Sequence, residues 1–128
     1  MRLLRIVGAV AVLAFLYPSS ARAAEVSGKW KAEFNTQVGV QKYTFDLKTA
    51  GAKLTGSASF ERMGETGQAE LKEGRVEGDK VFFVELLDFQ GNQVRIEYTG
   101  QLVGDEIKFT RKVGDFATEE FVAKRAKD

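Results

Sequence analysis

Two charged residues, Glu85 and Arg111, interrupt apolar alternating runs and are the residues best placed for chemistry. Each lies between two apolar residues at a spacing of two, the flanking pairs being Phe83 and Leu87, and Phe109 and Val113. Side chains two apart on a strand share a face. We therefore predict that both charges point inward, unless a slipped register turns them outward.

A buried charge without a partner costs several kcal/mol, so each must be compensated. In one interpretation, Glu85 and Arg111 pair with each other or with nearby tyrosines. In the other, Arg111, assisted by Tyr43 or Tyr98, receives the carboxylate of an amphipathic ligand, which its planar donor fork suits. The first is favoured because buried charges usually pair within the protein. The candidate ligand-binding residues are thus Tyr43, Glu85, Tyr98 and Arg111.

The composition restricts catalysis. The chain has no His and no Cys, which excludes His-based triads, thiol catalysis and the common zinc and copper sites. Glycoside hydrolysis by two carboxylates is the remaining alternative. Adjacent Glu119 and Glu120 would face opposite sides of a strand, which is poor geometry for it. We therefore favour a non-catalytic binding protein without a metal or cofactor.

The elements that carry these residues are predicted to be strands. Gly-Asp and Gly-Asn turns separate short alternating runs, and no apolar period of 3.6 residues is long enough for a helix. A change of phase near Glu73 and Gly74 predicts a β-bulge. Eight strands are expected, at about residues 28–35, 40–48, 53–60, 68–77, 80–89, 93–102, 105–113 and 119–125.

Closing the sheet on itself would bury the single apolar face of these strands and remove exposed edges. The predicted fold is all-β, an eight-stranded antiparallel up-and-down β-barrel formed by one domain, residues 24–128. A two-sheet sandwich is the alternative, but it usually needs longer crossovers.

Alternate connections of such a barrel share one end. Tight turns at 50–51, 78–79 and 104–105 would lie together with both termini and Trp30. Longer connections at 36–39, 61–67, 89–92 and 114–118 would form a mouth for a small apolar or amphipathic molecule. The interior is either filled by phenylalanines or left partly hollow by small residues, namely Ala32, Gly56 and Ala58.

The fifth strand has a second apolar phase, formed by Phe82, Val84 and Leu86. If the other phase faces inward, these residues form an outward stripe that fits a homodimer contact or a secreted enzyme partner. The alternative is that the N-terminal segment or a long neighbouring side chain covers the stripe.

Residues 1–23 have the pattern of a signal peptide. Arg2 and Arg5 precede an apolar run from Ile6 to Leu16, and Ala21-Arg22-Ala23 forms a cleavage motif. The mature chain, without a membrane span, would be exported to the periplasm or secreted. Removing residues 1–23 takes three arginines from the 19 basic residues and none of the 18 acidic ones, so the net charge becomes −2. Nucleic acid is a poor partner for such a surface.

Gly28 and Trp30 on the first strand, with Arg125 near the end of the last, resemble the calycin superfamily of lipocalins, fatty-acid-binding proteins and avidins. The resemblance implies that Trp30 closes one end of the barrel and Arg125 packs across it. Leu54-Thr55-Gly56 also resembles avidins. The chain differs in its single Trp, its lack of disulfides and a first connection too short for a helical lid.

Three stretches, residues 88–92, 96–100 and 108–116, are more closely similar to a group of small exported bacterial proteins. Those proteins occur alone or beside secreted glycoside hydrolases. The resemblance implies export and a lipocalin-like fold, and it gives the alternative function of an accessory module that contacts a glycan or an enzyme.

Overall fold

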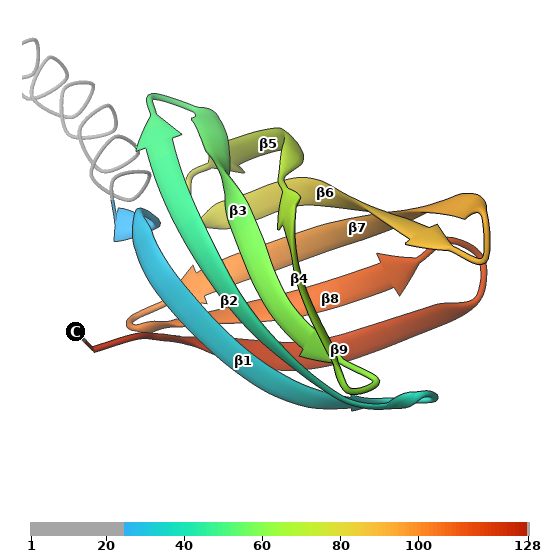
Figure 1. The fold of residues 1–128 in the computed structure, drawn as a ribbon. Helices are drawn as coiled ribbons and strands as arrows, with labels where there is room; N and C mark the ends of the chain where they lie inside the picture. Colours follow the sequence, from blue (N-terminus) through green and yellow to red (C-terminus); the bar gives the residue numbers. More distant parts are fainter. Residues whose placement is uncertain (1–24, 128) are drawn as a thin grey trace, which may run out of the picture.

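The protein, a computed structural model that describes residues 25–127, is a closed antiparallel sheet (Figure 1). The predicted signal peptide and its cleavage site lie outside the described residues. The strands are β1 (Gly28–Thr36), β2 (Gly39–Ala50), β3 (Lys53–Arg62), β4 (Glu65–Glu70), β5 (Lys72–Glu77), β6 (Lys80–Phe89), β7 (Asn92–Val103), β8 (Glu106–Val113) and β9 (Ala117–Arg125).

The strands follow one another around a barrel. Neighbours in space run in the order β2, β1, β9, β8, β7, β6, β5, β3, and β3 pairs again with β2 to close the sheet. β4 and β5 are two parts of the single fourth strand that the sequence predicts, so the barrel has eight strand positions. The predicted all-β, eight-stranded antiparallel barrel is confirmed. Within residues 25–127, no helix is long and apolar enough to span a membrane.

A bulge breaks the fourth strand where the sequence predicts it. The register between β5 and β6 shifts between Lys72 and Arg75, and Glu73 has a φ of 54°. A Cβ on Gly74 would lie 2.2 Å from the carbonyl oxygen of Leu54, so only glycine fits this approach. After the bulge, β5 pairs with β6. Before it, β4 pairs with β3, and the ladder between β5 and β6 ends at Val84.

This bulge leaves a gap in the barrel wall. β4 and the second half of β6 face each other without forming a ladder, in the part of the chain that the structure describes. Two other junctions of the wall are short, because β1 pairs with β9 at two positions and β3 pairs with β5 at one. The gap between β4 and β6 is lined by residues of a pocket that opens to the surface.

Aromatic side chains fill the interior away from the gap. Phe34 and Phe121 stack with ring centroids 4.1 Å apart, and Phe83 and Tyr98 with centroids 4.8 Å apart. Phe45 contacts several of these rings and is fully buried. Such rings bury large apolar areas and hold one another by offset and edge contacts. The barrel is therefore filled in this part.

The end opposite the gap is closed by Trp30. This residue is fully buried, and its Nε1 donates a hydrogen bond to the carbonyl oxygen of Val26 at 2.9 Å. The guanidinium carbon of Arg125 lies 4.3 Å from the ring centroid of Trp30. Arg125 also donates to the carbonyl oxygens of Ser27 and Glu25. Arg125 thus ties the first residues of the fold to its last strand.

The outward apolar stripe predicted on β6 is not a continuous exposed surface. Val84 is fully buried, Phe82 is half-buried and only Leu86 is exposed, at 37%. Arg95 of β7 donates two hydrogen bonds, of 2.6 and 2.9 Å, to the carboxylate of Glu73 on β5. Because β6 lies between β5 and β7, this ion pair crosses the outer face of β6. Long side chains of the neighbouring strands therefore cover the stripe, which is the alternative that the sequence left open.

Candidate ligand-binding site at the open end

The connections at the gap end are shorter than the sequence indicates. Two residues join β1 to β2, β3 to β4, and β6 to β7, and three join β8 to β9. In two of these turns both central residues have a positive φ: Met63 (53°) with Gly64 (76°), and Gln90 (53°) with Gly91 (83°). This is the hairpin geometry that matches the twist of the flanking strands. The strands therefore extend into stretches that the sequence suggests are loops.

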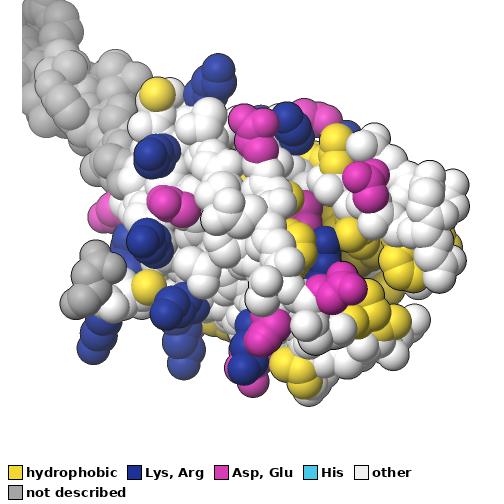
Figure 2. Space-filling model, viewed as in Figure 1, with side chains coloured by type: hydrophobic (Ala, Val, Ile, Leu, Met, Phe, Trp, Pro, Cys, Tyr) yellow, Lys and Arg dark blue, Asp and Glu magenta, His cyan; other side chains and the backbone are white. Residues whose placement is uncertain are grey.

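Each of these four connections carries an exposed apolar side chain at or beside it, and we call this set the apolar rim: Val38, Met63, Phe89 and Phe116. Phe116 is the most exposed of them, at 75%. Figure 2 shows hydrophobic side chains gathered at this end of the molecule, over the turns that join β6 to β7 and β8 to β9. Exposed apolar side chains gathered at one end of a molecule are typical of binding surfaces.

A pocket of about 810 Å³ opens inside the rim, between β4 and the second half of β6. Its walls are mainly apolar, with Leu86, Leu87, Val94 and Val113 among the residues that line it. Its floor is polar and is formed by Gln41, Arg62, Arg111 and Glu119. The site therefore has a polar floor and an apolar entrance.

Glu85 lies beneath this floor at the centre of a hydrogen-bond network. Its carboxylate accepts hydrogen bonds from the hydroxyls of Tyr98, at 2.8 Å, and Tyr43, at 3.1 Å. It also accepts one from Nη1 of Arg62 at 3.1 Å, which forms a buried ion pair. Glu85 is fully buried. The predicted inward direction of this residue is thus what the structure shows.

Arg111 uses all three of its side-chain nitrogens within the protein. Nε donates to the hydroxyl of Tyr98 at 2.9 Å, Nη2 to the hydroxyl of Tyr43 at 3.2 Å, and Nη1 to Oε1 of Glu119 at 2.6 Å. The two tyrosine hydroxyls therefore connect Arg111 to Glu85, and each donates its own proton to Glu85. This geometry corresponds to internal pairing and leaves Arg111 no nitrogen free of a protein partner.

Burial and the neighbouring polar groups shift the pKa of Arg111 in opposite directions. Burial alone would lower the pKa of Arg111, but the nearby hydroxyls of Tyr98 and Tyr43 and the hydrogen bond to Glu119 raise it above its ordinary value. The guanidinium therefore stays charged. With Arg62 and Arg111 each paired to one carboxylate, the four charged groups balance to zero.

Tyr43 and Tyr98 should make the free energy of unfolding depend on pH in the alkaline range. Burial first, and the charge of Glu85 second, raise the pKa of Tyr43 above its ordinary value of 10.0 and the pKa of Tyr98 well above it. The folded protein thus keeps protons that the unfolded chain releases, and the free energy of unfolding should fall as pH rises above about 10. Urea unfolding across this range measures the fall, and Tyr98→Phe should reduce its slope. Phenolate absorbance showing both tyrosines ionising near 10 in the folded protein would contradict it.

Sequence reasoning missed three residues of this site. Glu119 shares the inward phase of Phe121 and Ala123. Gln41 likewise shares the inward phase of Tyr43 and Phe45. The alternation of side chains therefore indicates that both residues point inward. Arg62 falls in a stretch that the sequence suggests is a loop. It belongs to β3 instead, where its guanidinium carbon lies 3.7 Å from the ring centroid of Phe60.

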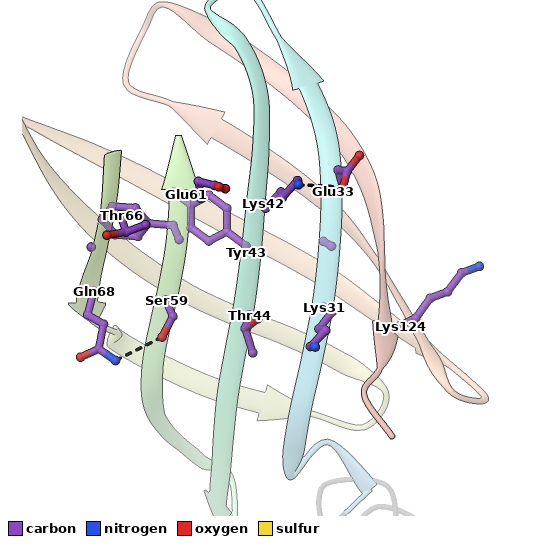
Figure 3. A pocket seen from close by; sticks show the side chains of 13 residues that line it. Lys31, Glu33, Lys42, Tyr43, Thr44, Ser59, Glu61, Thr66, Gln68 and Lys124 are labelled. Carbon is purple, nitrogen blue, oxygen red and sulfur yellow. Dashed lines mark hydrogen bonds and ion pairs between the residues drawn. The ribbon is translucent and has the colours of Figure 1, made fainter. Parts of the chain in front are cut away.

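A second depression, of about 970 Å³, lies on the outer face of β1 to β4 (Figure 3). Polar side chains point outward around it, and the hydrogen bond from Gln68 to Ser59 and the ion pair of Lys42 with Glu33 are formed between them. Its charges are solvated and do not converge on one point. This surface is therefore a weaker candidate for ligand binding than the pocket at the open end.

Among residues 25–127, the acidic residues form no candidate metal site, and Glu119 and Glu120 are divided between the two faces of β9. No group of three or more acidic residues there is placed to hold a metal ion. Glu119 faces inward and pairs with Arg111, whereas Glu120 is exposed on the other face. The two carboxylates therefore do not face a common substrate, as the sequence indicates.

No protein-family model matches the chain, and neither a curated protein nor a solved structure matches it significantly. The fold and the geometry of the open end are therefore the basis for functional inference. The closed eight-stranded barrel is compatible with a calycin-like fold.

Proposed function

We propose that this chain is an exported, non-catalytic binding protein whose open end takes a small apolar or amphipathic molecule. The pocket between β4 and β6 is the observation that carries the proposal. Its volume of about 810 Å³ lies in the range of sites for small organic ligands, which are concave and mainly apolar with a few converging polar groups. Export is inferred from the pattern of residues 1–23, and a calycin-like ligand-binding role agrees with the closed barrel.

The distribution of polar groups supports one orientation for an amphipathic ligand. Its polar head would lie on the floor near Arg62 and Glu119, and its apolar body would lie between Leu86, Leu87 and the apolar rim. Burial of the apolar body, at about 25 cal/mol per Å², would supply most of the binding energy. The alternative role as an accessory module has less support, because the stripe proposed for partner contact is covered.

Binding of the uncharged fluorescent probe N-phenylnaphthylamine tests this function. The parent protein should bind it saturably, with enhanced and blue-shifted emission. Ala69→Phe places a large ring in the pocket from β4 and should weaken binding about tenfold or more, because it occupies the apolar volume. Ala52→Phe, the same change in an exposed turn at the closed end, is the matched control and should bind like the parent. Absence of binding by the parent, or equal binding by all three proteins, would reject the proposal.

A further inference from the structure

We propose that Gln41 recognises the head of the ligand, and that this head is uncharged and carries an O–H or N–H donor. The inference rests on the proposed function and specifies the ligand class of the same pocket.

The first observation is an unpaired acceptor. Gln41 on β2 is only 5% exposed and lines the pocket. Its Oε1 is the one buried side-chain polar atom without a hydrogen-bond partner within residues 25–127. A buried carbonyl oxygen without a partner is costly, and native proteins rarely leave one. A ligand that donates a hydrogen bond to this oxygen would complete the site.

The groups around Gln41 do not meet this need. Arg62 is its cross-strand neighbour on β3, but Nη1 of Arg62 is directed to Tyr43 and Glu85. Phe34, its neighbour on β1, has no polar side-chain atom. Gln41 therefore remains at the floor of the pocket as an acceptor that the protein itself does not use.

The second observation is the charge balance of the floor. Arg62 pairs with Glu85 and Arg111 pairs with Glu119, and these side chains range from fully buried to 13% exposed. A carboxylate or an ammonium head would bring one uncompensated charge into this mostly buried group, at a cost in desolvation. An uncharged donor avoids that cost. A hydroxyl or amide head is therefore preferred to either ion.

A matched series of ligands with one alkyl chain tests the inference, by displacement of N-phenylnaphthylamine. The series is dodecanol, dodecyl methyl ether, dodecanoate and dodecylammonium. The parent should bind the alcohol about fivefold more tightly than the ether, the gain expected for one hydrogen bond, and more tightly than either ion. Gln41→Leu should reduce the ratio of alcohol to ether affinity to about one.

Gln41→Leu should also raise the melting temperature of the unliganded protein, because it removes an unpaired buried oxygen. Gln101→Leu, the same change at an exposed position on β7, is the control and should alter neither the ratio nor the melting temperature.

The outcomes separate this inference from the proposed function. If the probe and the whole series fail to bind, the proposed function itself fails. If the series binds but the parent shows no preference for the alcohol over the ether, or prefers an ion, only the inference about Gln41 is overturned. A lower melting temperature for Gln41→Leu also overturns it, since Gln41 would then stabilise the empty protein. The ratio measured on the parent alone decides the matter if the variant does not fold.

Discussion

Replacing Glu85 with Gln should lower the free energy of unfolding by about 3–5 kcal/mol, the range for removing one partner of a buried ion pair. Arg62 would lose the carboxylate that it contacts at 3.1 Å. The hydroxyls of Tyr43 and Tyr98 would lose their charged acceptor. The amide would also place an N–H donor beside three groups that donate to this position. Urea unfolding of the parent and the variant measures the difference.

Two further variants make this experiment specific. Glu97→Gln removes a carboxylate from an exposed pair with Arg95, and it should cost less than about 1 kcal/mol. Adding Arg62→Met to Glu85→Gln removes the positive charge left without a partner, so the double variant should lose less stability than the two single losses together predict. A loss for Glu85→Gln as small as that for Glu97→Gln would show that the charges beneath the pocket floor are solvated.

Replacing Trp30 with Ala should cost about 3–5 kcal/mol, as large-to-small aromatic changes in cores do. Trp30 is fully buried, and its loss would also remove the ring beneath Arg125 and the hydrogen bond to Val26. Because it is the only Trp of the chain, its emission reports directly on the closed end. The parent should emit at short wavelength, and the emission should shift to the red on unfolding.

Phe116→Ala is the matched control for this prediction. It also truncates an aromatic residue, but one on the apolar rim that is 75% exposed, so its effect should stay within about 0.5 kcal/mol. A water-like emission maximum in the folded parent, together with an unchanged stability of Trp30→Ala, would disprove closure of the barrel by Trp30.

The strands and their inward faces were predictable because side chains alternate with a strict period of two. The same rule placed Glu85 and Arg111 inside, and the change of phase at Glu73 and Gly74 located the bulge. The same alternation would also place Gln41 and Glu119 inside, because they share the phase of their buried neighbours. It could not show that Gln41 lacks a partner, because that depends on where the side chains of other strands end.

Features that involve three strands at once were not predictable. The phase of Val84 indicated exposure, but the ion pair of Arg95 and Glu73 covers β6 from both neighbouring strands. The gap between β4 and β6 likewise arises from the direction that the chain takes on each side of the bulge. The sequence shows that a bulge exists, and only the pairing of the strands shows which edges it separates.

The contact between β1 and β9 has a consequence for how the protein is made. This junction consists of two register pairs, Trp30 with Arg125 and Lys31 with Lys124, so the first strand has to pair with the last strand of the barrel. Until β9 is available, the strands made before it can form only an open sheet, with β1 at one unpaired edge. The barrel can close only after Arg125 has left the ribosome.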